Sequence, residues 1–157
     1  MSLTKQELIE RICEVLPQDT KLLSPAEAVA TIMDCVPTFA GKLKENMFVG
    51  TEPESPKTCI TFYDTGGPNE QDAFNANDTV NVQVRVRSEQ YRTGWQLISE
   101  IKTSLQSIPG VEFNGQCVIG IWVENPPTLI GKDGQGNCLF TMNLRLIVRS
   151  EHTGHRA

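Results

Sequence analysis

The stretch from Thr79 to Ser88 alternates without a break between valine and polar side chains. A second stretch, from Phe140 to Arg149, repeats the pattern near the C-terminus. Successive side chains of a strand point to opposite faces, so each stretch predicts a strand with one face on a core and one face in water. The polar face of the first strand carries two arginines, whose planar guanidinium groups suit pairing with carboxylates on another surface.

Three segments have the periodicity and the boundaries of helices. Thr4 and Glu7 form a capping box ahead of an apolar stripe that ends before Pro17. The segment Ser24–Glu27 is a second start signal, with proline at the first helical position, and this helix should stop just before Pro37. A third helix runs from Tyr91 to Ile108, where apolar residues recur at spacings of three and four.

The remaining apolar segments are shorter and predict strands. Met47–Val49 and Thr58–Tyr63 are the first two. Cys117–Val123 is apolar at successive positions, which predicts a strand near the centre of the sheet. The prolines of Asn125–Pro127 then demand a bulge or an edge position. A strong turn signal at Asp133–Asn137 leads into the last strand.

Residues 64–78 show no periodicity over 15 positions and read as a loop, of the length that is usually functional or disordered. The order of elements predicts an α+β fold, a single domain over residues 1–150 followed by a flexible polar tail at 151–157. Hairpin-length connections imply a mostly antiparallel sheet of four to five strands, with the helices packed on one face.

Composition places few limits on this picture. The chain has 157 residues, of which 39% are hydrophobic and 21% charged, as expected for a globular protein. No apolar run approaches the roughly 20 residues that span a bilayer, and the N-terminus has no secretory signal pattern. We therefore expect no membrane partner and a location in the cytosol of the producing cell.

Charge is unevenly distributed along the chain. The formal net charge is −5, which disfavours sequence-specific binding of nucleic acid. Residues 1–78 hold 6 Lys/Arg against 13 Asp/Glu, whereas residues 79–157 hold 8 against 6. This split is either a chance gradient or the sign of an acidic surface on one subunit that meets a basic surface on another.

Residues suited to catalysis or metal binding are sparse. The five cysteines are an odd number without a CxxC pair, so we expect small core residues rather than disulfides or a zinc site. His152 and His155 lie in the tail without a third ligand. No histidine elsewhere can activate a nucleophile, and no glycine-rich phosphate loop is present. The sequence predicts no enzyme, no metal and no cofactor.

Two further features have a structural and a functional interpretation. Asp64 with Asp72 or Asp78 would be a calcium site, but their spacing fits no calcium-loop pattern and favours a solvated loop. Trp95 and Trp122 fall on periodic apolar faces, where a core position is expected.

Several motifs, taken together in this order and spacing, carry a likeness to a known family. They are Asn46–Gly50, Cys59–Gly67, Val82–Arg87 with Tyr91, and Pro127–Gly136 before the closing strand. From Met47 to Arg149 the chain resembles the small tail-terminator, or tail-completion (minor capsid), proteins of long-tailed bacteriophages and prophages. The helix at residues 24–36 departs from that pattern.

The resemblance implies a structural virion protein in the neck of the particle. It implies a ring-shaped oligomer, usually a hexamer, assembled in the bacterial host cytoplasm. Such a ring sits on the last ring of the tail tube, stops tube growth and docks to the head connector or stopper protein. DNA passes through its channel, and an acidic chain would suit a channel along which DNA slides without sticking.

For such an assembly the sequence offers interface candidates in the long loop and on the polar sheet faces. They are Asp64, Gly66, Gly67, Asp72, Asp78, Arg85, Arg87, Arg145 and Arg149. The alternative for the arginines is a solvated sheet face. Two alternatives for function also stay open: a head-completion or adaptor ring of the same connector, or a small cytosolic ligand-binding α+β domain.

Overall fold

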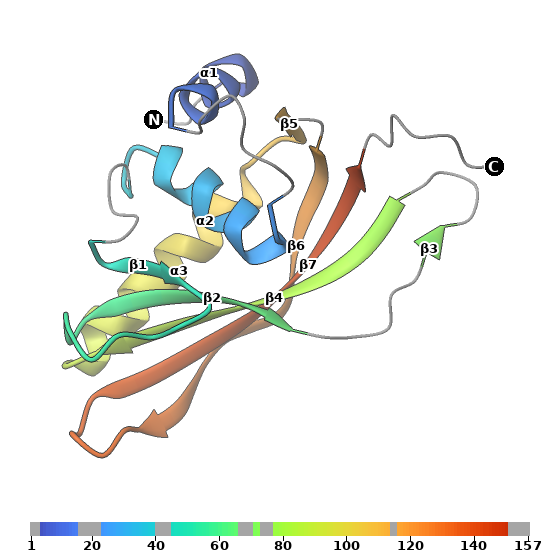
Figure 1. Cartoon of the computed structure of the whole chain (residues 1–157). Coiled ribbons are helices and arrows are strands. Elements are labelled where there is room, and N and C mark those ends of the chain that lie inside the picture. The colour runs from blue at the N-terminus through green and yellow to red at the C-terminus, as the bar shows by residue number, and fades with distance from the viewer. Residues whose placement is uncertain are drawn as a thin grey trace.

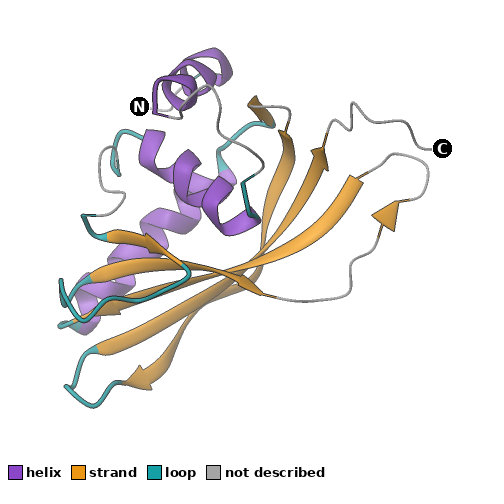
Figure 2. Ribbon diagram, in the orientation of Figure 1, coloured by secondary structure: helices purple, strands orange, loops and turns teal. Residues whose placement is uncertain are grey.

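One curved sheet organises the molecule, and the helices lie against its concave side (Figures 1 and 2). The computed structural model describes residues 4–15, 23–39, 45–65, 71–72, 77–113 and 116–150. Within these ranges the strands are β1 Met47–Val49, β2 Cys59–Thr65, β3 Gln71–Asp72, β4 Asn77–Ser88, β5 Val111–Phe113, β6 Gln116–Lys132 and β7 Cys138–Ser150. They form a sheet of order β1-β2-β4-β7-β6-β5, with β3 paired separately to β4.

The α+β prediction is confirmed, and the predicted strand count of four to five is wrong. The described residues contain seven paired strands, and β1 runs parallel to β2, so the sheet is mixed. The two strands that the sequence did not reveal are β3 and β5, which have two and three residues. Segments this short cannot display an alternating pattern, and only their pairing partners define them as strands.

The helices are α1 Lys5–Val15, α2 Pro25–Cys35 and α3 Tyr91–Gln106. Both predicted capping boxes are present. Thr4 Oγ1 accepts from the Glu7 amide at 3.2 Å, and Glu7 Oε2 accepts from the Thr4 amide at 2.9 Å. Ser24 and Glu27 make the same reciprocal pair at the start of α2. These bonds satisfy amides that the first helical turn leaves without a partner.

Strands β4 and β7 pair over twelve positions and set the two faces of the sheet. Even-numbered residues of β2, β4 and β7 point toward the helices, and this side is termed the inner face. Its core side chains are Ile60, Phe62, Val82, Val84, Val86, Phe140, Met142, Leu144 and Leu146, all at most 1% exposed. They pack with Val29, Ile32 and Met33 of α2 and Ile98, Ile101 and Leu105 of α3. Fully burying each such side chain contributes about 1.5–3 kcal/mol.

Strand β6 is not at the sheet centre, as its apolar sequence had suggested. Its 17 residues pair with β7 on one side, but β5 covers only Gln116–Val118 on the other. The rest of β6 is therefore a sheet edge within the described residues. The bulge predicted at Asn125–Pro127 is confirmed, because the register to β7 shifts on both sides of Asn125. An edge strand tolerates proline because its outward amides need no partner.

The predicted turn between β6 and β7 is also confirmed. Asp133 Oδ1 accepts from the backbone amides of Gln135 and Asn137, both at 2.9 Å. Gly136 has φ 81°, a left-handed conformation that glycine adopts without strain. We term β6, this turn and β7 the long hairpin.

Three of the cysteines are buried as expected, and one is half-buried. Cys35, Cys59 and Cys138 are the buried ones and Cys117 is intermediate, all as free thiols. The side chain of Cys13 lies outside the described residues. None of the described helices has the length and apolar character needed to cross a membrane.

Candidate interaction surfaces

All four arginines singled out from the sequence lie on the outer face of the sheet, opposite the helices. Arg85 and Arg87 come from β4, and Arg145 and Arg149 from β7. They occupy odd positions in the paired register, on the face that core residues such as Val84 do not use. A strand's period of two is sufficient to place them together.

Arg87 is not solvated, which corrects the expectation of a water-exposed polar face at this position. It is 7% exposed, and its guanidinium donates to four backbone carbonyl groups. Nε reaches the Lys57 oxygen at 2.9 Å, while Nη2 reaches the oxygens of Pro53, Glu54 and Pro56 at 2.6, 3.2 and 2.8 Å. These bonds hold residues 52–57, termed the covering segment, over the outer face of β2 and β4.

A carboxylate completes this arrangement. Glu52 Oε2 lies 3.4 Å from Arg87 Nη1, and Glu52 Oε1 lies 3.4 Å from Arg85 Nε. Burial under the same segment raises the pKa of the Cys59 thiol and the pKa of the Tyr63 hydroxyl. Arg85 keeps 30% of its side chain exposed. This half of the outer face therefore uses its arginines mainly for contacts within the chain.

Arg145 has a different environment. It lies on the half of the outer face that β7 and β6 form, which we term the bare half. Its guanidinium carbon lies 5.9 Å from the ring centroid of Trp122, its cross-strand partner on β6. Trp122 is 43% exposed, so its predicted core position is wrong. The indole lies across Gly120, where an added Cβ would meet ring atoms Cη2 and Cζ3. Cation–π pairs of this exposed kind contribute about 0.5–1 kcal/mol.

Arg149 lies further along the same face. Its Nε donates to Asn77 Oδ1 at 3.0 Å across the β4–β7 pair, and the residue is exposed. Arg145 and Arg149 are therefore the two outer-face arginines of the group that keep their charge accessible to another molecule.

The carboxylates singled out from the sequence lie elsewhere. Asp64 and Asp78 pair with Val82 and Val148, which places both on the inner face. Asp64 Oδ1 accepts from the Ala26 amide at 2.9 Å, so this carboxylate binds the N-terminal turn of α2. Asp72 belongs to β3 and pairs with Asn77. Gly66 and Gly67 lie outside the described residues.

The expected 15-residue loop is thus partly strand. Strand β2 extends to Thr65, and β3 occupies Gln71–Asp72. In the described part of the chain no three His, Cys, Asp or Glu side chains gather where they could hold a metal ion. The sheet itself separates the inner-face carboxylates from the outer-face arginines.

An aromatic cluster at the start of α3 was not anticipated. Tyr91 and Trp95 flank Phe140, with ring centroids 5.5 and 6.2 Å away, and both stay exposed, at 54% and 42%. The predicted core position of Trp95 is therefore wrong. Leu129, 42% exposed, is the cross-strand partner of Phe140 and adds to the same surface. The spacing of four between Tyr91 and Trp95 is the signal that groups them on one helix face.

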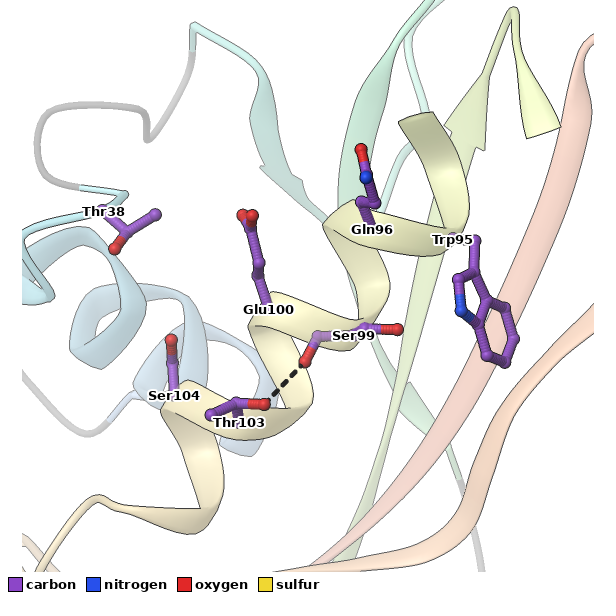
Figure 3. Close-up of a pocket in the computed structure, with 7 residues that line it drawn as sticks. All are labelled: Thr38, Trp95, Gln96, Ser99, Glu100, Thr103 and Ser104. Atoms are coloured by element: carbon purple, nitrogen blue, oxygen red, sulfur yellow. Dashed lines mark hydrogen bonds between the residues drawn. The ribbon is translucent and has the colours of Figure 1, made fainter. Parts of the chain in front are cut away.

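A shallow groove of about 660 Å³ continues from Trp95 along α3 (Figure 3). Polar side chains on successive turns of the helix line it: Gln96, Ser99, Glu100, Thr103 and Ser104, with Thr38 from the segment after α2. The Thr103 hydroxyl donates to the Ser99 carbonyl at 3.1 Å. Glu100 makes no ion pair with any other described residue. The groove is therefore lined by one carboxylate and by one exposed indole, which project from different sides of α3.

Exposed aromatic side chains near charged ones on both sides of the sheet are candidate interaction surfaces, but they do not identify a class of protein by themselves. Comparison with known families identifies the class: residues 38–149 match the family described as bacteriophage tail terminator protein, and the chain belongs to that family. It is therefore a phage tail structural protein and a component of the virion. The matched region contains every interface candidate named above, whereas α1 and α2 precede it.

Of two further comparisons, the search of curated proteins finds no match. Among solved structures, a chain from the virion of a native gene transfer agent particle is similar, with a TM-score of 0.52 and 12% sequence identity. The alignment covers 91% of this chain and 95% of that chain. At this identity the likeness concerns the fold alone, and it includes nearly the whole molecule.

Proposed function

We propose that this protein forms a closed ring, most simply a hexamer, that caps the tail tube and joins it to the head connector. The observation that carries the proposal is the family match over residues 38–149. Its partners would be further copies of itself, the tail tube protein and the connector or stopper protein, with assembly in the host cytoplasm.

The distribution of charge supports ring closure. A ring is built from head-to-tail contacts, in which two different patches of the same chain meet. In this protein exposed arginines lie on the outer face of the sheet, and Asp64, Asp78 and Glu100 lie on the side of the helices. Opposite charges on opposite faces favour stacking of copies in one direction and disfavour face-to-face pairing of like patches.

The role requires no bond-making. A terminator needs a rigid sheet and surfaces that recognise its neighbours, and we propose that it acts without catalysis, metal or cofactor. DNA would pass through the ring, and the net charge of −5 would limit adhesion of the phosphate backbone to the channel.

The test is the mass and shape of the native particle. Purified protein is examined by light scattering and electron microscopy, alone and with tail tube protein, at low ionic strength. The proposal expects a closed ring in at least one condition and tails of normal length when the protein is supplied to a phage lacking it. Monomers in every condition, together with tails whose length the protein does not change, contradict the proposal.

A further inference from the structure

Two exposed patches on opposite sides of β7 have complementary chemistry. The outer patch is Trp122 with Arg145, on the bare half of the outer face. The inner patch is the α3 groove, which is lined by Glu100 and by Trp95 from different sides of the helix. Each combines exposed aromatic surface with one charge, and the two charges are opposite.

Both patches have the composition of residues that dominate binding energy. Tryptophan, tyrosine and arginine are the side chains most often found at the energetic centre of protein interfaces. Among the described residues, the guanidinium of Arg145 contacts the Trp122 ring and forms no hydrogen bond or ion pair. The groove volume of about 660 Å³ is ample for an arginine or an indole side chain to enter.

The register of β7 makes a contact between the patches directional. Arg145 occupies an odd position and faces outward, whereas Phe140, which supports Tyr91 and Trp95, occupies an even position and faces the helices. One molecule therefore cannot bring its own two patches together. A twofold pair would have to present both patches of one molecule to the same neighbour, which their placement on opposite sides of the sheet disfavours.

We propose that the outer patch of one copy docks on the inner patch of the next, with Arg145 paired to Glu100 of the neighbour and Trp122 packed against Trp95. The occupant of the α3 groove is thus a second copy of this chain, argued from charge complementarity. The proposal rests on the ring assembly of the preceding section and assigns its subunit contact to particular residues.

The experiment is a charge exchange across the contact. The variants are Arg145→Glu, Glu100→Arg and the chain carrying both changes. Two reversals at exposed positions outside the patches are matched controls: Lys57→Glu, on the covering segment, and Glu112→Arg, on β5. Self-association is measured by sedimentation at two salt concentrations, with tail tube protein where the parent requires it. Thermal melting verifies that every variant is folded, which is expected because both sites are exposed.

Each single reversal should weaken self-association by about tenfold or more, since desolvated interfacial charge pairs commonly carry that much coupling. The doubly reversed chain restores the opposite charges and should associate within about threefold of the parent. An equimolar mixture of the two single variants should co-assemble better than either alone. The two controls should associate like the parent.

Three results would overturn the contact. If both single reversals associate like the parent, neither patch takes part in the subunit contact. A double variant no better than the weaker single variant shows that the two charges do not meet. Loss of tube binding with self-association intact assigns the outer patch to the tube protein instead. A parent that never assembles contradicts the ring itself, which distinguishes failure of the proposed function from failure of this contact.

Discussion

The outer face of the sheet has two halves that are alike in sequence and different in structure. On β4 and β2, the covering segment lies over Arg87 and leaves it 7% exposed. On β7 and β6, Arg145 lies on an exposed tryptophan with no segment above it among the described residues. Both arginines belong to alternating strands that pair with each other. The pattern along a strand defines the face of a residue, and the chain that returns over this face decides its role.

The difference has an energetic basis. A buried guanidinium is tolerated only when its donors are satisfied, and Arg87 meets this condition with four carbonyl groups and one carboxylate. An exposed arginine keeps its hydration, so its side chain contributes little to folding and stays available to a partner. The covered half is therefore structural, and the bare half is the candidate contact surface.

The largest expected effect is on folding. Arg87→Met should lower the free energy of unfolding by about 3–5 kcal/mol, because it leaves buried carbonyl groups and the Glu52 carboxylate without their partner. Arg145→Met should change it by about 0–1 kcal/mol. Urea unfolding followed by circular dichroism measures both. Equal losses in the two variants would contradict the distinction between a covered and a bare half.

The arginine pair Arg85 and Arg87 must accordingly be treated separately. If both side chains were solvated, reversing both charges with glutamate would spare the fold. With Arg87 buried, the double variant should unfold, and the Arg85→Glu variant alone is the appropriate probe of the surface. Arg85 is 30% exposed and shares Glu52 with Arg87, so some loss of stability is expected even there.

Substitutions at two glycines test the difference between the packed side and the bare half of the sheet, with smaller expected losses of stability. A Cβ at Gly94 would lie 2.5 Å from Phe140 Cε2 and 2.9 Å from Ser88 Cβ, in the packed inner side. The three atoms nearest to a Cβ at Gly120 all belong to the ring end of Trp122, which can move into solvent. Gly94→Ala should therefore cost about 1–2 kcal/mol after the gain in helix propensity, whereas Gly120→Ala should cost about 0.5 kcal/mol or less.

The Gly120 change should instead displace the indole from Arg145. Its readout is the emission of Trp122, isolated in a Trp95→Phe background, which should shift as the ring loses its place on the strand. Self-association of Gly120→Ala should weaken while its unfolding midpoint stays near that of the parent. A variant with unaltered emission and unaltered association would show that the ring position does not matter to the outer patch.

Much of the fold was predictable because it depends on local sequence. The capping signals at Thr4 and Ser24 fixed two helix starts, and the alternating strands fixed which residues share a face. The prolines after Val123 identified a bulge at an edge. These features depend on backbone geometry within a few residues, so a single sequence contains them.

The interaction surfaces were less predictable, for a physical reason. Burial of Arg87 and exposure of Trp95 and Trp122 depend on which distant segments lie over them, and periodicity carries no such information. An apolar face can belong to a core or to a surface that another molecule covers. The strand placement of Cys117–Val123 was wrong for the same reason, since an apolar strand at a sheet edge reads like one at the centre.

The smallest expected effect concerns the turn at the tip of the bare half. The side-chain amide of Asn137 donates to Asp133 Oδ2 at 3.0 Å, and this bond, with the two backbone amides, holds the pKa of Asp133 below its usual 3.8. Folding therefore favours the ionised carboxylate. Its contribution to stability is present above about pH 3.8 and is lost as the pH falls through the lower folded pKa.

The measurement is the difference in melting temperature between the parent and Asp133→Asn, followed from about pH 6 down to about pH 2.5. Asparagine at this position does not titrate, so the parent should be the more stable protein at the upper end, and the difference should shrink toward the acidic end. Asn137→Ala removes the side-chain amide that donates to Asp133 Oδ2 and should weaken the pH dependence that Asp133 confers. A difference that stays constant over the whole range would show that the turn does not hold the carboxylate in its charged form. In that case the left-handed conformation of Gly136, and not the charge of Asp133, would account for the order of this turn.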